Sequence, residues 1–268
     1  MKTIIRKTLL ALAATATVAF SAGASAADYP NFEVEALFPN KTFSFEADKI
    51  TGNYVELIDF TNPGEFKVSL YWTAAAFVKN DGTTSLAAKD TGLTSRYGIY
   101  ALYNASGTVT TNGASTTFTF APGSGNLEVW YDKGVNTEFT ANAANTAFTS
   151  VGTKNDTLLA TGIALSGQGT LDPSLSTCGN GSGINCGSFG STTTFTLTDA
   201  GKAFFVSPTP FYPLSFQSGQ LNNFDVSGNQ KVNGSLDVVF AVPEPTSIAL
   251  LGLGLVGFGL SRRRSKKI

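Results

Sequence analysis

Strict alternation of apolar and polar side chains is the feature that most restricts the fold of this chain. In the stretch EFKVSLYWT the residues on one face of an extended segment are all apolar: Phe66, Val68, Leu70 and Trp72. A period of two is typical of a strand with one buried face. The segment NYVELIDF alternates in a similar way, and turn-forming residues 62–65 separate it from EFKVSLYWT. The two segments are therefore predicted to form a hairpin.

Further short strand-like segments recur along the chain, separated by clusters of Gly, Asn, Ser and Thr. The predicted strands are residues 32–38, 98–103, 116–120, 127–131, 158–165, 192–197, 214–217 and 235–240. Helical segments are expected at most at residues 71–77, 84–89 and 141–148, although residues 72–78 could equally extend a strand. The chain is therefore predicted to be all-β, with an antiparallel β-sandwich or jelly-roll-like body.

Residues 1–26 have the three parts of a secretory signal peptide. Lys2, Arg6 and Lys7 precede an apolar stretch at residues 9–20, and a sequence of small residues ends at Ala26. A basic start, a short apolar middle and small residues at the exit favour export with cleavage after Ala26 over a buried N-terminal helix.

Residues 27–241 form the predicted extracellular β-rich domain, and this domain is acidic. Without the basic residues of the two ends it contains ten Lys and Arg against eighteen Asp and Glu, a net charge of −8. A negative surface repels polyanions, so we expect no nucleic-acid partner. The length fits one sizeable domain better than two small ones.

The complete lack of histidine removes whole classes of chemistry. Ser-His-Asp and Cys-His nucleophile systems need an imidazole, as do nearly all catalytic zinc sites. We expect no metal and no cofactor; Asp81, in KNDGTT, is interpreted as part of an Asp-Gly turn, with a calcium ligand as the alternative. Paired carboxylates remain open, because glycoside hydrolysis needs only two acids at a suitable separation.

The sequence LEVWYD contains the candidate sugar-binding residues Glu128, Trp130 and Asp132. Alternate residues of a strand project from one face at steps of about 7 Å. An aromatic side chain between two acids could form a platform on which a sugar ring stacks. The alternative interpretation is a solvent-facing strand on which Trp130 partly covers the sheet.

The two cysteines of the chain, Cys178 and Cys186, lie in CGNGSGINC. In an exported protein such a pair is most simply a disulfide that closes a tight loop. The alternative is a reactive or metal-binding pair, for which the chain offers no further thiol or imidazole.

The C-terminal sequence VPEPTSIALLGLGLVGFGLSRRRSKKI combines prolines, an apolar run and a basic end. The apolar residues 248–260 would span only about 20 Å as a helix, against a hydrocarbon core of about 30 Å. The run is therefore predicted to be a marginal anchor. Its basic flank would stay in the cytoplasm, which places the body outside, in agreement with the signal peptide.

Residues 242–268 resemble the PEP-CTERM sorting signal of Gram-negative bacteria that make exopolysaccharide. The resemblance rests on two groups of residues, a sorting motif and a basic stop: Val242, Pro243, Glu244 and Pro245, then Arg262, Arg263 and Arg264. It implies that an exosortase, a membrane cysteine peptidase, cuts near Pro-Glu-Pro after the precursor is held in the inner membrane. The protein would then be a substrate and not an enzyme. The alternative is an ordinary tail anchor with a proline-rich spacer.

The stretch FSFEADKITGNYVELIDF, residues 43–60, is similar to the opening of the flocculation-associated PEP-CTERM proteins of floc-forming bacteria. This similarity implies a structural or adhesive protein at the cell surface or in the matrix, where it helps cells and exopolysaccharide to aggregate. A carbohydrate-binding module that uses exposed aromatics is the alternative, and a glycan-cleaving enzyme is a third hypothesis.

Overall fold

The computed structural model describes residues 29–38, 41–179, 183 and 185–240. The predicted signal peptide, residues 1–26, and the predicted sorting segment, residues 242–268, lie outside the described residues. Within the described part, no helix has the length and apolar character needed to cross a membrane.

Strands dominate the described chain, with two short α-helices and two 3-10 turns. The strands are β1 (Phe32–Phe38), β2 (Lys41–Ala47), β3 (Lys49–Phe60), β4 (Glu65–Lys79), β5 (Thr84–Ser85), β6 (Gly98–Asn112), β7 (Ser115–Phe120), β8 (Asn126–Asp132), β9 (Glu138–Ala141), β10 (Phe148–Val151), β11 (Thr157–Gly162), β12 (Ala164–Leu171), β13 (Gly187–Thr193), β14 (Thr196–Leu197), β15 (Phe205–Ser207), β16 (Leu214–Ser218) and β17 (Gly228–Phe240). The helical elements are α1 (Ala88–Thr91), η1 (Thr153–Asn155), η2 (Ser176–Cys178) and α2 (Asp199–Phe204).

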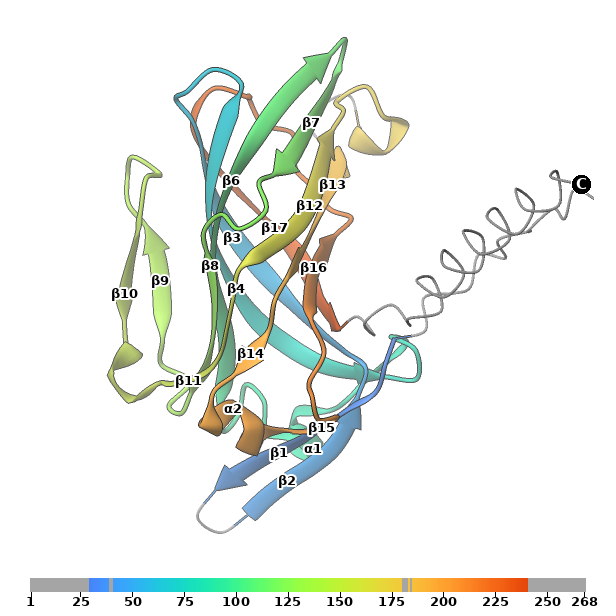
Figure 1. Cartoon of the computed structure of the whole chain (residues 1–268), viewed down its shortest axis with the longest axis vertical. Coiled ribbons are helices and arrows are strands. Elements are labelled where there is room, and N and C mark those ends of the chain that lie inside the picture. Colours follow the sequence, from blue (N-terminus) through green and yellow to red (C-terminus); the bar gives the residue numbers. More distant parts are fainter. Residues whose placement is uncertain (1–28, 39–40, 180–182, 184, 241–268) are drawn as a thin grey trace, which may run out of the picture.

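The main sheet closes on itself to make a barrel-like body (Figure 1). In the described residues its ring runs β6, β7, β12, β13, β16, β17, β3 and β4, and the pairing of β4 with β6 completes the circle. Every neighbouring pair in this ring is antiparallel. A ring of about eight strands leaves an interior just wide enough for side chains or one small ligand.

The predicted hairpin forms the wall between β3 and β4. Tyr54 pairs with Trp72 and Ile58 pairs with Val68, and all four side chains face the interior. The apolar face of EFKVSLYWT is therefore the inner face, as the alternation predicted. β3 bulges between Thr51 and Gly52. A Cβ atom on Gly52 would lie 2.3 Å from the Trp72 indole nitrogen, so this glycine makes room for the tryptophan.

β6 is long enough to have different neighbours along one edge. Its first half pairs with β8 and its second half pairs with β7. β8 continues outward to β11 and β14, and the separate β9–β10 hairpin stands outside this wall (Figure 1). The outer face of β8 is therefore beside the hairpin.

A small three-stranded sheet, β15-β1-β2, covers one end of the barrel together with α2 and α1 (Figure 1). Aromatic side chains fill the junction; they include Phe32, Phe205, Phe211 and Phe240, with ring centroids 4.9 to 6.1 Å apart in the contacts that Phe32 makes with the other three. We call the interior next to this sheet the lower lumen; it is lined by Ile50, Trp72, Ile99, Phe195, Phe216 and their neighbours. The upper lumen, toward the β6–β7 hairpin, is lined by Glu56, Ile58, Phe66, Val68, Phe118 and their neighbours.

The predicted all-β, antiparallel fold is confirmed, and the sheet is barrel-like. The helices expected at residues 71–77 and 141–148 are wrong. The first segment lies inside β4 because its pairing with β3 overrides the helix preference of three consecutive alanines. The second is the β9–β10 turn. In the third segment, residues 84–89, the chain forms β5 and only the start of α1.

Candidate functional site

Trp130 lies on the outer face of β8, within a group of aromatic side chains that we call the outer aromatic cluster. The cluster consists of Tyr71 on β4, Tyr100 on β6, Trp130 on β8, and Phe139 and Phe148 on the β9–β10 hairpin. Because β4, β6 and β8 are hydrogen-bonded neighbours, their outward side chains form one row across the sheet.

The hairpin packs on one end of this row and leaves the other end accessible. Phe139 contacts Tyr71 and Tyr100, with ring centroids 4.5 Å and 5.5 Å apart. Trp130 lies parallel to Tyr100, with centroids 6.3 Å apart and an interplanar angle of 9°. Tyr100 is buried beneath the hairpin, whereas Trp130 is half-buried. The indole of Trp130 is therefore the accessible end of an otherwise covered aromatic row.

The structure brings two of the three predicted sugar-binding residues together on the accessible surface. The indole N–H of Trp130 donates to Glu128 Oε2 over 3.1 Å, which orients the ring beside a carboxylate. Asp132 is on the same outer face but is only 4% exposed. Its two oxygens accept the backbone N–H groups of Gly134 and Thr137, each over 3.0 Å, so this carboxylate organises the loop that leads to β9.

A further acid, Asp156, lies under the hairpin and was not singled out from the sequence. Its Oδ2 accepts from the hydroxyls of Tyr100 and Thr137, each over 2.8 Å. Burial and the charges of neighbouring acids, including Asp132 and Asp156, raise the pKa of Tyr71 to about 12. Burial and the hydrogen bond to Asp156 also raise the pKa of Tyr100. Both phenols therefore stay protonated at neutral pH, and the Tyr100 hydroxyl donates to Asp156.

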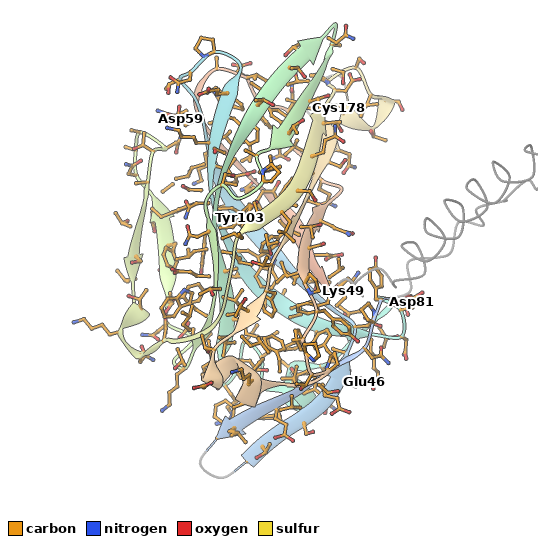
Figure 2. The ribbon with its side chains drawn as sticks, viewed as in Figure 1. Glu46, Lys49, Asp59, Asp81, Tyr103 and Cys178 are labelled. Carbon is orange, nitrogen blue, oxygen red and sulfur yellow. A yellow bond between two sulfur atoms is a disulfide. The ribbon has the colours of Figure 1, made fainter. Side chains whose placement is uncertain are left out.

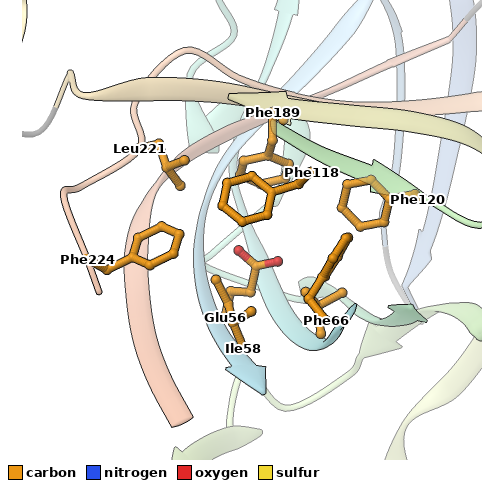
Figure 3. Close-up of a pocket in the computed structure, with 10 residues that line it drawn as sticks. Glu56, Ile58, Phe66, Phe118, Phe120, Phe189, Leu221 and Phe224 are labelled. Atoms are coloured by element: carbon orange, nitrogen blue, oxygen red, sulfur yellow. The ribbon is translucent and has the colours of Figure 1, made fainter. Parts of the chain in front are cut away.

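Glu56, in the upper lumen, is the second chemically distinctive residue that sequence reasoning missed. It is only 4% exposed, and burial raises the pKa of its carboxyl to about 8. The alternation of NYVELIDF held a signal for it, because Glu56 occupies the same face as Tyr54, Ile58 and Phe60. Figure 3 shows its carboxyl group pointing into a ring of phenylalanine side chains.

Cys178 and Cys186 form a disulfide in the structure, with Cα atoms 4.3 Å apart. Both are buried, and Figure 2 shows Cys178 at the end of the body opposite the β1–β2 sheet. The backbone N–H of Cys186 donates to Leu221 O over 2.9 Å, and Leu221 N–H donates to Gly187 O over 3.1 Å. The disulfide loop is thereby tied to the chain between β16 and β17.

No cluster of three or more acidic or thiol side chains suited to a metal occurs within the described ranges. Asp81, the alternative calcium ligand, lies in a turn with positive φ of 58° and accepts the backbone N–H of Tyr29 over 3.2 Å. The neighbouring N–H of Gly82 donates to both oxygens of Asp48. These hydrogen bonds account for Asp81 as a turn residue.

Comparison with known proteins gives a match at the C-terminal end. A family model for the PEP-CTERM protein-sorting motif matches residues 241–264. By this motif the chain is a PEP-CTERM protein. No curated protein and no solved structure shows significant similarity to it. The predicted resemblance to PEP-CTERM proteins is therefore confirmed. The match does not extend to the β-rich body.

The motif indicates an extracellular protein that an exosortase processes. It is a secreted protein with a C-terminal sorting signal that anchors it at the membrane before processing. The sorting residues Pro243, Glu244 and Pro245 fall inside the matched range, as do the basic residues Arg262, Arg263 and Arg264. All of them lie outside the described residues.

Proposed function

We propose that this PEP-CTERM protein is a structural or adhesive component of the cell surface or of an exopolysaccharide matrix, where it promotes aggregation of cells. The observation that carries the proposal is the sorting motif at residues 241–264, because this motif indicates a secreted protein that is processed at the membrane. The body supports it with an acidic, Thr- and Ser-rich composition and a closed antiparallel sheet.

Two of the carboxylates beside the outer aromatic cluster support a structural role for this protein over catalysis. Asp132 accepts two backbone N–H groups and Asp156 accepts two hydroxyls. A glycosidase needs one acid that shuttles a proton and a second that attacks the sugar or activates water. Acids held by loop and tyrosine donors stabilise the β9–β10 hairpin instead, so we propose no enzymatic activity.

A carbohydrate-binding module is the second candidate, favoured by the geometry of Trp130 and Glu128. A half-buried indole beside a carboxylate offers a flat face for the C–H groups of a sugar and an acceptor for its hydroxyls. Under this proposal exopolysaccharide is the partner of the exported body. Binding of purified matrix polysaccharide should be lost on Trp130→Ala and retained on Trp130→Phe.

The aggregation proposal is tested with a deletion strain and two complementing genes. One gene encodes the full chain, and the other ends before the sorting segment at residue 242. We expect the deletion to reduce floc formation, the full chain to restore it, and the truncated chain to be exported without restoring it. Normal flocs in the deletion strain would refute the proposal.

Replacement of Pro243, Glu244 and Pro245 by alanine separates export from sorting. Export depends on the N-terminal signal and should be unchanged. Alanines let a helix continue through the cleavage site and remove its charge, so processing should stop. Immunoblots should show a longer protein in membrane fractions and none in the matrix. A shortened, normally delivered variant would mean that the tail is only an anchor. Lys267→Ala, which removes one charge outside the matched residues 241–264, is the matched control.

A further inference from the structure

The upper lumen contains one acidic side chain in apolar surroundings. Glu56 projects inward from β3, and the other residues around the space are apolar or glycine (Figure 3). They are Ile58, Phe66, Val68, Phe118, Phe120, Gly169, Phe189, Leu221 and Phe224. A carboxyl group that leaves water for such surroundings normally has a hydrogen-bonding partner.

No group in the described part of the chain donates a hydrogen bond to this carboxyl. Burial is the only resolved influence on its pKa, without any hydrogen-bonding contribution. The charge of Glu56 contributes to the raised pKa of two nearby tyrosines, but the hydroxyls of these tyrosines are directed elsewhere. Tyr54 donates to Gln220 O over 3.4 Å, and the Tyr103 hydroxyl lies 2.7 Å from Ser191 Oγ. Any hydrogen-bonding partner of the Glu56 carboxyl therefore comes from outside the described residues.

The space in front of Glu56 is narrow and has aromatic walls. Its cavity volume is about 20 Å³, which is room for about one water molecule. Gly169 widens it, because a Cβ atom there would lie 3.1 Å from Phe189 Cβ and 3.4 Å from Phe118 Cδ2. A single ring or a short chain suits these walls, provided that the mouth opens.

The mouth is covered by the connection between β16 and β17, which has a fixed part and a side-chain gate. Leu221 is fixed by backbone hydrogen bonds to Cys186 and Gly187. Phe224 is half-buried and stacks on Phe60 at 6.0 Å, with Phe118 also at 6.0 Å. Phe224 contributes its ring to this cover, so a movement of that side chain alone would leave the backbone hydrogen bonds of Leu221 in place.

We propose that the upper lumen binds a small neutral molecule that is apolar except for one hydroxyl group, which enters past Phe224 and hydrogen-bonds to Glu56. A protonated carboxyl both donates and accepts, and a hydroxyl does the same, so the two groups satisfy each other. Burial keeps Glu56 protonated at neutral pH. This site is independent of the sorting signal and of the outer aromatic cluster, so it goes beyond the proposed function.

The test compares p-cresol with toluene, which differ by the hydroxyl group. Binding to the purified, secreted protein is measured by calorimetry and by NMR of the Ile58 methyl groups, which line the space. We expect p-cresol to bind about tenfold more tightly than toluene, because the free energy of one net hydrogen bond corresponds to about that ratio of dissociation constants. Glu56→Leu should abolish that ratio, and Glu56→Gln should keep most of it.

Two further variants show whether the ligand occupies the lumen. Ile58→Phe should fill the space and abolish binding of both probes while Glu56 is retained. Phe224→Ala should accelerate association of p-cresol, because the gate is removed. Circular dichroism confirms that each variant is folded. A probe that binds these variants like the parent protein would lie elsewhere and overturn the proposal.

Three results would contradict the assignment directly. Equal affinity of p-cresol and toluene in the parent protein would show that Glu56 takes no part. Tighter binding of p-methylbenzylamine, a cation at neutral pH, would replace the neutral ligand class by a cationic one. If millimolar p-cresol leaves the Ile58 methyl signals unchanged, the partner of Glu56 is water only.

Discussion

The two halves of the lumen differ in the environment of one buried polar side chain, Trp72 in the lower half and Glu56 in the upper half. In the lower lumen the Trp72 indole is 1% exposed, and its N–H donates to Leu236 O over 2.9 Å. In the upper lumen Glu56 is 4% exposed, and no described group donates a hydrogen bond to its carboxyl. The lower half is closed by a three-stranded sheet, and the upper half by one connecting segment.

The difference separates the part of the body that maintains the fold from the part that can accept a ligand. A satisfied polar group inside tight aromatic packing contributes to stability and fixes one arrangement of side chains. An unsatisfied carboxyl costs stability, and natural proteins tolerate such a cost chiefly at functional positions. We therefore interpret the lower lumen as the half that maintains the fold and the upper lumen as the half that can accept a ligand.

The largest effect is expected in the lower half, from Trp72→Ala. The change removes a fully buried indole and leaves a cavity beside Gly52. It also removes the side-chain hydrogen bond to the carbonyl oxygen of Leu236. The free energy of unfolding should therefore fall by about 5 kcal/mol. Urea unfolding followed by circular dichroism measures the loss. Trp72→Phe keeps most of the packing and should cost about half as much. A loss below about 1 kcal/mol for the alanine variant would show that the lower lumen is not the stabilising half.

The next effect is a pH dependence that belongs to the upper half. The ordinary pKa of 4.5 for Glu56 applies when the chain is unfolded, and burial raises the pKa to about 8 in the folded protein. Between these values the folded state binds more protons, so its stability is full below about pH 4.5 and falls as the pH rises to about 8. The shift of the pKa from 4.5 to about 8 corresponds to on the order of 5 kcal/mol.

Urea unfolding between pH 5 and pH 9 tests this dependence, with Glu56→Gln as the matched control. The glutamine variant should lose most of the decline and be more stable than the parent protein at pH 9. The tyrosines near Glu56 do not titrate between pH 5 and pH 9, because burial raises the pKa of Tyr103 to about 12 and also raises that of Tyr54. Parallel curves for parent and variant would mean that Glu56 is hydrated.

Much of this architecture follows from local patterns in the sequence. The alternation in EFKVSLYWT correctly placed Phe66 to Trp72 on the inner face, because a strand with one buried face must alternate. Closure of the sheet could not be predicted in the same way, since it depends on pairing β4 with β6 across long sequence separations. The three alanines at residues 74–76 also led to a wrong helix prediction, because strand pairing overrides their helix preference.

The candidate sites show a similar division between local and long-range information. The outward alternation of Glu128 and Trp130 was visible in LEVWYD, but the burial of Asp132 was not, because it depends on the β9–β10 hairpin. The alternation of NYVELIDF places Glu56 on an otherwise apolar face of the predicted strand. Its surroundings come from β7, β12, β13 and the β16–β17 connection, which only the folded chain brings together.

Removal of the disulfide should have a smaller effect, confined to the upper half. The bond between Cys178 and Cys186 closes a short loop, which corresponds to about 2 to 3 kcal/mol in the chain-entropy model. The double variant with serines should lose that much stability and exchange the amide hydrogen of Leu221 faster, because this amide is bonded to the neighbouring Gly187. Trp72 and its neighbours should keep their protection. Mass spectrometry of unreduced peptides first checks the bond itself; two free thiols would refute it.

The smallest expected effect is a difference of about 2 kcal/mol between the losses caused by two substitutions of half-buried phenylalanines, one at each end of the lumen. Phe211 packs among Phe32, Phe205 and Phe240 at the covered end, whereas Phe224 contacts Phe60 and Phe118 at the mouth of the upper lumen. Phe211→Ala should therefore cost about 3 kcal/mol, and Phe224→Ala only about 1 kcal/mol, because the space beside Phe224 already reaches solvent. Chemical unfolding of the two variants under one condition measures the difference. Equal losses would mean that the connection over the upper lumen is packed as firmly as the three-stranded sheet, and Phe224 could not then serve as a gate.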